Sequence, residues 1–270
     1  MNHPDLDTLD ASLRELLHKT GAFARREFER FSFSDVVYKG ENNPFTYVDV
    51  TAENMLRDGC AALIPGSGFV NEEGEDIPSQ NGFTWIIDPI DGTANFTHGV
   101  PHYCISLALQ DPEGMWLGYI YAPESGDLFH AVRGGGAFLQ GKPIQVSEQA
   151  QMPTSLIATG FPYDDMGFRD RYLVLLNEVM QKSQGMRRMG SAALDLAYVA
   201  SGRFEAFFEY NLNAWDVAAG ALILQEAGGQ VSDFNGGEDY LFGKQILATN
   251  GKIHTDLLEI LQRHDLLGSV

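Results

Sequence analysis

The 270-residue chain is poor in cysteine and in basic side chains. Its two cysteines, Cys60 and Cys104, are too few for a disulfide framework and stand among apolar neighbours. We therefore expect buried free thiols in a reducing cytoplasm. Lysine and arginine number 18 against 37 aspartates and glutamates, and the resulting net charge of −19 argues against binding to nucleic acid or to anionic lipid.

Long hydrophobic runs and several familiar motifs are also missing. No apolar run approaches the roughly 20 residues of a membrane span, and the acidic N-terminal segment lacks the pattern of an export signal. The chain has no G-K-[ST] phosphate loop, no Cys-x-x-Cys pair and no H-E-x-x-H, which disfavours P-loop and zinc chemistry. We expect a cytoplasmic protein with no nucleic-acid or membrane partner.

Helical and strand patterns alternate along the chain, without repeats or an obvious linker. The patterns predict helices at about 6–28, 50–63, 168–181, 192–200, 217–227 and 253–261. They predict strands at about 83–87, 104–110, 115–121, 128–132, 155–159, 204–208 and 245–248. This alternation indicates a layered α/β fold that forms one catalytic unit, residues 1–270, with halves of about 1–150 and 151–270.

The most informative segment is WIIDPIDGTANFTHGVP, in which two carboxylates, Asp88 and Asp91, precede a Gly-Thr step. We expect Pro89 to end the preceding strand, so that both carboxylates lie in a connection. Gly92 would let a ligand approach the backbone, and Thr93 would cap a short helix whose N–H groups face an anion. Two carboxylates alone would repel a phosphate group, but Mg²⁺ could bind to the carboxylates and to the phosphate at the same time. Alternatively, the acids beside Pro and Gly only initiate a turn.

Two distant acidic segments favour the metal hypothesis. Asp216, in NAWDVAAG, opens an apolar helical stretch, although a carboxylate there could simply cap the helix. Glu72 and Glu73 follow a short apolar segment, where a solvated charge run is the simpler interpretation. We expect Glu72 rather than Glu73 to be the functional side chain.

Together these segments resemble the inositol monophosphatase family, which consists of Mg²⁺-dependent, lithium-sensitive phosphomonoesterases. IDPIDGTANF resembles the first signature of the family and WDVAAGALILQEAGG the second, and the similarity extends from about Thr46 to Asn250. The resemblance implies a five-layer α-β-α-β-α sandwich with the metal site between its two sheets. It also implies a homodimer.

The resemblance further implies the ligands of the metal ions. Glu72, Asp88 and the backbone carbonyl of Ile90 would hold one Mg²⁺, and Asp88, Asp91 and Asp216 would hold a second. A third, weaker ion would use Glu72 and waters, so that two or three ions occupy each site.

The implied mechanism is in-line attack on phosphorus by a metal-activated water. Thr93 and Glu72 would orient this water, and Asp49, in a T-x-x-D segment, would orient Thr93. The backbone N–H groups of Gly92 and Thr93 would bind the phosphoryl oxygens.

Substrate choice rests on weaker signals. Gly190, Ser191 and Ala192 resemble the segment that contacts inositol, and Glu209 stands where a carboxylate accepts sugar hydroxyls, although it could equally be an ordinary acid at a strand end. The resemblance implies hydrolysis of inositol monophosphate to inositol and phosphate. Alternative substrates are fructose 1,6-bisphosphate, adenosine 3′,5′-bisphosphate or another sugar or polyol phosphate. An alternative from another class is a regulatory, protein-binding role.

Overall fold

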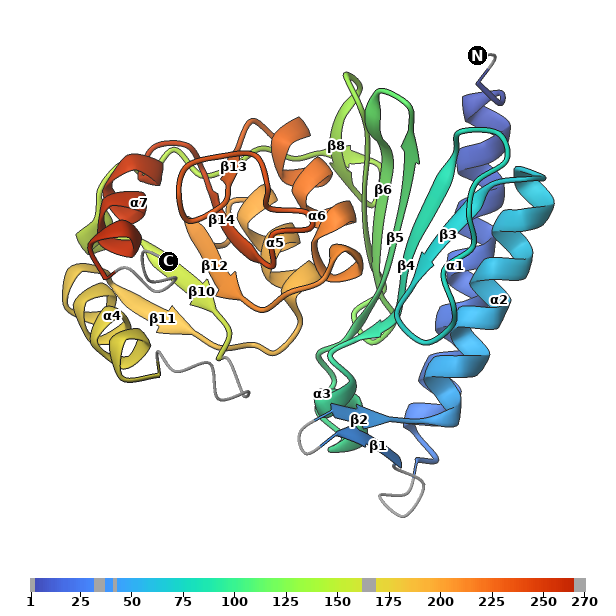
Figure 1. Ribbon diagram of the computed structural model, residues 1–270, viewed down its shortest axis with the longest axis horizontal. Coiled ribbons are helices and arrows are strands. Elements are labelled where there is room, and N and C mark those ends of the chain that lie inside the picture. Colours follow the sequence, from blue (N-terminus) through green and yellow to red (C-terminus); the bar gives the residue numbers. More distant parts are fainter. Residues whose placement is uncertain (1–2, 32–36, 41–42, 162–168, 265–270) are drawn as a thin grey trace.

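Two β-sheets and three layers of helices stack into five layers (Figure 1). The computed structural model describes residues 3–31, 37–40, 43–161 and 169–264, with the backbone alone for 37–40 and 43–45. Helices α1 (Leu6–Phe28) and α2 (Tyr47–Leu63) cover the outer face of the larger sheet. Helices α5 (Ala192–Ala200) and α6 (Ala214–Glu226) lie between the sheets, and α4 (Arg169–Lys182) and α7 (His254–Arg263) cover the smaller sheet. This arrangement confirms the five-layer α-β-α-β-α fold.

The larger sheet has seven strands that are neighbours in chain order, and only its first pair, β3 and β4, is parallel. The strands are β3 (Gly68–Asn71), β4 (Thr84–Asp91), β5 (Cys104–Asp111), β6 (Gly114–Ala122), β7 (Asp127–Val132), β8 (Gly136–Leu139) and β9 (Lys142–Pro143). A short helix, α3 (Thr93–Thr97), connects β4 to β5.

The smaller sheet has five strands in the order β11-β10-β12-β14-β13. They are β10 (Leu156–Thr159), β11 (Gly185–Arg187), β12 (Ala206–Tyr210), β13 (Gln230–Ser232) and β14 (Gln245–Thr249). Strand β10 is parallel to both of its neighbours, whereas β14 is antiparallel to both of its own. A separate hairpin joins β1 (Val37–Gly40) to β2 (Asn43–Phe45), and the 3-10 turn η2 (Met152–Thr154) precedes β10.

Small residues allow the middle layer to contact both sheets. Helix α6 is apolar on nearly every side because it packs between the two sheets. A Cβ atom on Gly118 of β6 would lie 2.9 Å from the carbonyl oxygen of Ala219, and one on Gly220 would lie 2.6 Å from Leu196 of α5. The run of small residues after Trp215 therefore sets how closely α6 approaches its neighbours.

Several boundaries differ from the sequence-based prediction for identifiable reasons. Strand β4 does not end before Pro89, because a bulge between Asp88 and Asp91 accommodates a residue that lacks an N–H. Helices α2 and α6 each begin three residues earlier than predicted, at Tyr47 and Ala214. The short strands β1, β2, β3, β8, β9, β11 and β13 were not predicted, and residue 168, the predicted start of α4, lies outside the described residues.

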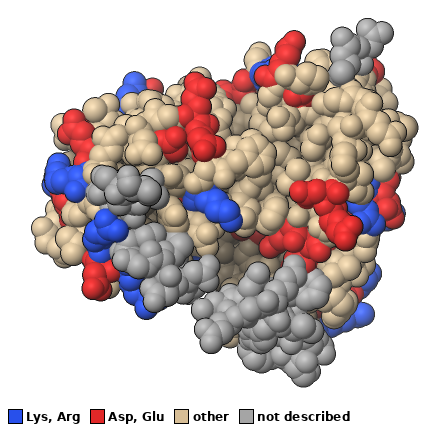
Figure 2. Space-filling view, in the orientation of Figure 1, with Lys and Arg blue, Asp and Glu red and all other residues tan. Residues whose placement is uncertain are grey.

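The outer surface bears acidic side chains that are dispersed over the visible face of both halves (Figure 2). The net charge of −19 is therefore not gathered in a single patch on that face. Within the described ranges, no helix combines the length and apolar character that crossing a membrane requires.

A polar cluster beneath α1 ties this helix to the larger sheet. Arg14 contacts Asp10 at 2.7 Å and Nε2 of His130 at 2.6 Å, and the hydroxyl of Tyr119 donates to Asp10 at 2.7 Å. Burial of His130, followed by the nearby charge of Arg14, lowers the pKa of the imidazole to about 4.

Acidification should therefore destabilise the protein. An unfolded imidazole protonates near its ordinary pKa of 6.5, but the folded His130 does so only near 4. The free energy of unfolding should thus fall as the pH drops from about 6.5 to 4, by up to roughly 1.4 kcal/mol per pH unit from this group. Denaturant unfolding across this pH range should show that the free energy of unfolding depends less steeply on pH in His130→Gln than in the wild type. Identical pH dependences would contradict the lowered pKa of His130.

Candidate metal centre and active site

Three aspartates from distant parts of the chain converge where β4 meets the start of α6. Asp88, Asp91 and Asp216 each offer a carboxylate oxygen, and these oxygens lie within 4.8 Å of one another. Asp88 and Asp91 are buried, whereas Asp216 is half-buried. The structure thus brings together the two acidic segments that the sequence separates by more than a hundred residues.

Asp91 is held by the start of α5. Its Oδ2 atom accepts hydrogen bonds from the hydroxyl of Ser191 at 2.6 Å and the N–H of Ala193 at 2.7 Å, and its Oδ1 accepts from the N–H of Ala192 at 3.3 Å. Burial raises the pKa of Asp91 while these donors oppose the shift. Ser191 and Ala192, predicted to contact substrate, therefore also position a carboxylate of the cluster.

Asp88 and Thr93 are connected through Ile90. The N–H of Ile90 donates to Asp88 at 2.9 Å, and the carbonyl of Ile90 accepts from the hydroxyl of Thr93 at 2.9 Å. The prediction that Thr93 caps α3 is wrong. Gly92 is the N-cap residue, with a φ of 100° that favours glycine, and Thr93 is already the first helical residue. The threonine hydroxyl contacts the carbonyl of Ile90 and the carboxylate of Asp49 instead.

Asp49 reaches the same hydroxyl from α2. One carboxylate oxygen accepts hydrogen bonds from the N–H and hydroxyl of Thr46, which closes a capping box at the start of the helix. The other oxygen lies 3.3 Å from Oγ1 of Thr93. Burial raises the pKa of Asp49 to about 6. The T-x-x-D segment therefore both begins α2 and places a carboxylate behind Thr93.

Asp216 is the third residue of α6, whereas the sequence-based prediction placed it directly before the helix. The N–H of Asn213 donates to Asp216 at 2.6 Å, so Asn213 and Asp216 form a capping box and the helix begins between them. Enclosure by the protein, followed by the charge of Asp91, raises the pKa of Asp216 to about 7. The carboxylate of Asp216 is thereby fixed at the N-terminus of α6.

Glu72 lies beside this group, in the loop after β3, and interacts with Asp88 and Asp216. Its Oε2 atom is buried and has no hydrogen-bond partner among the residues that the structure describes. Burial, followed by the charges of Asp216 and Glu73, raises the pKa of Glu72 well above its ordinary value. An unpartnered carboxylate oxygen beside three crowded aspartates fits a divalent cation, because oxygen ligands and charge neutralisation are what Mg²⁺ requires.

Glu209 approaches the cluster from the end of β12. Its carboxylate lies directly over Gly160, where a Cβ atom would stand 1.8 Å from Oε1 of Glu209. Enclosure by the protein, followed by the charge of Asp216, raises the pKa of Glu209 to about 8. Gly190, with a φ of 91°, lies against Gly92, where a Cβ atom would stand 3.1 Å from the carbonyl oxygen of Gly190. Asn95 donates to the carbonyl of Met189 at 2.9 Å and so ties this segment to α3.

Two buried acids near the site, Glu53 and Asp195, were not among the predicted residues. Asp195 has an unpartnered Oδ1 within the described part of the chain, and the nearby charges of Glu209 and Asp91 add to burial in raising its pKa. Glu53 stands four residues after Asp49. That helical spacing was the available signal, since residues i and i+4 share one face.

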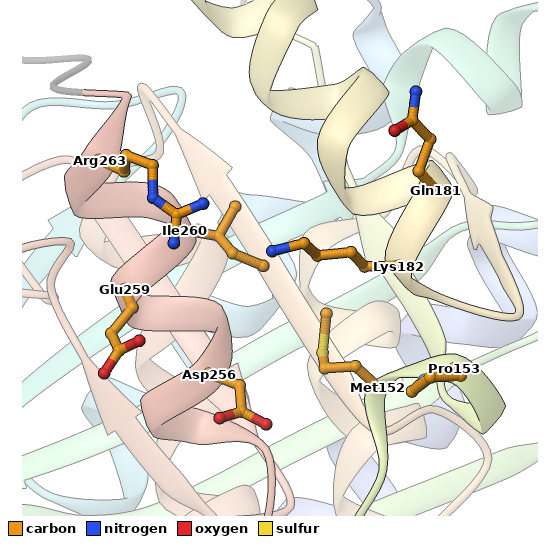
Figure 3. A pocket seen from close by; sticks show the side chains of 8 residues that line it. All are labelled: Met152, Pro153, Gln181, Lys182, Asp256, Glu259, Ile260 and Arg263. Atoms are coloured by element: carbon orange, nitrogen blue, oxygen red, sulfur yellow. The ribbon is translucent and has the colours of Figure 1, made fainter.

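A separate surface pocket of about 430 Å³ lies between α4, α7 and η2, on the outer side of the smaller sheet (Figure 3). Lys182 and Arg263 extend toward each other across it. Both contact Glu178, at 2.8 and 2.5 Å, and the hydrogen bonds from Lys182 and His264 hold the pKa of this carboxyl at about 2. These charges join α4 to α7 and contribute nothing to the acidic cluster.

A layered fold with crowded carboxylates between its sheets defines a metal-dependent phosphomonoesterase. The sequence model of the inositol monophosphatase family matches residues 5–266, and the chain belongs to that family.

Known proteins from three bacteria are similar to this chain over most of their length. The inositol-1-monophosphatase of Rhizobium meliloti is 40% identical over 250 residues, which cover 92% of this chain and 94% of the relative. A putative Nus factor SuhB of Neisseria meningitidis is 43% identical over 227 residues, covering 84% and 87%. The crystal structure of the extragenic suppressor protein SuhB from Bartonella henselae superposes with a TM-score of 0.90 at 37% identity, covering 95% and 99%.

The two adjacent glutamates should differ in their effect on metal affinity. Because Glu72 lies beside Asp88 and its Oε2 is buried without a hydrogen-bond partner among the described residues, Glu72→Gln should weaken Mg²⁺ binding by about 10- to 100-fold. Glu73→Gln removes the same charge one residue away and should retain most of the affinity. Isothermal titration of the metal-free proteins with Mg²⁺ measures both. A larger loss in Glu73→Gln would reverse the assignment.

Proposed function

We propose that this phosphomonoesterase hydrolyses inositol monophosphate to inositol and phosphate with Mg²⁺ as its metal. The observation that carries the proposal is the convergence of Asp88, Asp91 and Asp216. Glu72 lies beside them, and its Oε2 has no hydrogen-bond partner in the described part of the chain. The substrate is supported by the similarity to the inositol-1-monophosphatase of Rhizobium meliloti and by the carboxyl group of Glu209 near the cluster.

Two or three Mg²⁺ ions would be held by oxygen ligands that the chain already groups. Glu72, Asp88 and the carbonyl of Ile90 would hold one ion, and Asp88, Asp91 and Asp216 a second, with Glu72 contributing to any third. When bound, such ions lower the pKa of a coordinated water and stabilise the departing alkoxide. Their charge would also offset the burial and the mutual repulsion that raise the pKa values of Asp88 and Asp216.

The side chains around the cluster would orient the attacking water. Thr93 directs its only hydroxyl proton toward the carbonyl of Ile90 and the carboxylate of Asp49, so its lone pairs remain available to accept a hydrogen bond from water. Glu72 would accept a second hydrogen bond through Oε2. Gly92 and Thr93 would donate backbone N–H groups to the phosphoryl oxygens. Attack in line with the leaving alcohol needs no covalent phosphoenzyme.

The leaving alcohol would contact Glu209 and the Gly190–Ala192 segment. A carboxylate can accept hydrogen bonds from two hydroxyls at once, which suits vicinal hydroxyls of a polyol. Fructose 1,6-bisphosphate, adenosine 3′,5′-bisphosphate and other sugar phosphates remain the alternative substrates for the same ligands.

Phosphate release from a panel of these esters tests the proposal. Inositol 1-phosphate should give the highest kcat/KM, and activity should require Mg²⁺ and be inhibited by lithium. Asp91→Asn and Asp216→Asn should each lower kcat by roughly 100-fold or more, because each removes a ligand that supports several kcal/mol of transition-state stabilisation. Undiminished turnover in either variant, or turnover independent of metal, would refute the mechanism.

Two variants test the role of Glu209 from opposite sides. Glu209→Gln replaces one carboxyl oxygen with an amide group that cannot accept a hydrogen bond, while Gly160→Ala places a methyl group where the carboxylate lies and displaces it. Both should raise KM for inositol 1-phosphate by about 10-fold and leave KM for p-nitrophenyl phosphate, which has no vicinal hydroxyls, almost unchanged. Equal changes in KM for both substrates would show that Glu209 does not bind the hydroxyls of the polyol.

The cellular setting is part of the proposal. Two buried free thiols, Cys60 and Cys104, suit the reducing cytoplasm, and homodimers are expected from the family resemblance. The Neisseria relative is named a putative Nus factor, which supports a second, regulatory protein-binding role for this scaffold. The two roles are compatible because the acidic cluster lies between the sheets and leaves the outer surface available to a partner.

A further inference from the structure

Helix α2 directs two buried carboxylates toward the metal centre, one helical turn apart. Asp49 and Glu53 are only 1% and 3% exposed. Asp49 contacts the hydroxyl of Thr93, as described above, whereas Glu53 contacts the loop that carries Glu72. The Oε2 atom of Glu53 accepts a hydrogen bond from the N–H of Glu73 at 2.8 Å.

This hydrogen bond fixes one peptide plane. The N–H of Glu73 belongs to the peptide unit that joins Glu72 to Glu73, and all atoms of that unit are nearly coplanar. Its orientation therefore determines the direction in which the chain leaves Glu72. A Cβ atom on Gly74 would lie 2.8 Å from the other carboxylate oxygen of Glu53, so the loop packs closely on this carboxylate.

The remainder of the loop is closed independently of Glu53. The side-chain amide of Asn71 donates to the carbonyl of Glu75 at 2.9 Å, and the N–H of Asn71 donates to Asp76 at 3.2 Å. These bonds join the two ends of the loop but do not touch the peptide after Glu72. The carboxylate of Glu53 instead accepts a hydrogen bond from that peptide directly.

We propose that Glu53 is a positioning residue of the metal centre, which orients the peptide between Glu72 and Glu73 so that Glu72 faces the acidic cluster. This inference rests on the proposed metal-dependent function. Burial of a carboxylate costs free energy unless its oxygens accept hydrogen bonds. Backbone N–H groups donate to Glu53, and these hydrogen bonds in turn fix the direction of the peptides that carry them. Glu53 itself contacts neither metal nor substrate.

Mg²⁺ titration of the metal-free full-length chain tests the proposal by calorimetry. Glu53→Ala should raise the Kd for Mg²⁺ by about 10- to 100-fold, as loss of a residue that orients a metal ligand does. At saturating Mg²⁺, kcat should recover to within a few-fold of the wild type. Glu53→Gln retains a carbonyl oxygen that can accept a hydrogen bond from the N–H of Glu73. Its Kd for Mg²⁺ should lie between those of the wild type and Glu53→Ala. Asp58→Asn, which removes an exposed carboxylate from the same helix, is the control and should bind Mg²⁺ normally.

Thermal unfolding separates positioning from general stabilisation. With a positioning role, the rise in Tm caused by Mg²⁺ should shrink in Glu53→Ala relative to wild type at equal metal concentration. An unchanged Kd with a lower Tm at every Mg²⁺ concentration would overturn the proposal. If Glu53→Ala does not fold, the Kd of Glu53→Gln decides, and a wild-type value there overturns it. A wild type that binds no Mg²⁺ would overturn the proposed function as well.

Discussion

The repulsion among carboxylates enclosed between two sheets is the constraint on which this structure depends. Removing a carboxylate from water disfavours its charged form, and the close approach of Asp88, Asp91 and Asp216 disfavours it further. The protein tolerates this arrangement because backbone and hydroxyl donors face each acid. Ser191 donates to Asp91, Ile90 to Asp88 and Asn213 to Asp216.

These donors come from the places where regular structure begins or is interrupted. The bulge in β4 turns the N–H of Ile90 toward Asp88, and the first turns of α5 and α6 supply N–H groups that have no partner within their helices. The site therefore requires both sheets and both inner helices at once. Small residues at their contacts, such as Gly118 against Ala219, permit this approach.

A single helix supports two parts of the site from outside the cluster. Asp49 closes the capping box of α2 and also contacts the hydroxyl of Thr93. Glu53 packs against the loop after β3 and also accepts a hydrogen bond from the peptide after Glu72. An acid that is satisfied by backbone N–H groups can be buried without a cationic partner, which suits an environment already crowded with negative charge. The scarcity of lysine and arginine is consistent with a site built to receive cations rather than to supply them.

The sequence by itself determined the layered α/β class, most helices and long strands, and the acids of the cluster, because hydrophobic periodicity and short motifs are local properties. It also predicted Asp49 and Glu72 as site residues through resemblance. The tertiary structure decided that Pro89 lies inside β4, that Gly92 rather than Thr93 caps α3, and that Ser191 and Ala192 hold Asp91. It also revealed Gly160 beneath Glu209 and Glu53 behind Glu72. These features depend on contacts between segments far apart in the chain, and no local pattern encodes which distant N–H group or carboxylate will face a given residue.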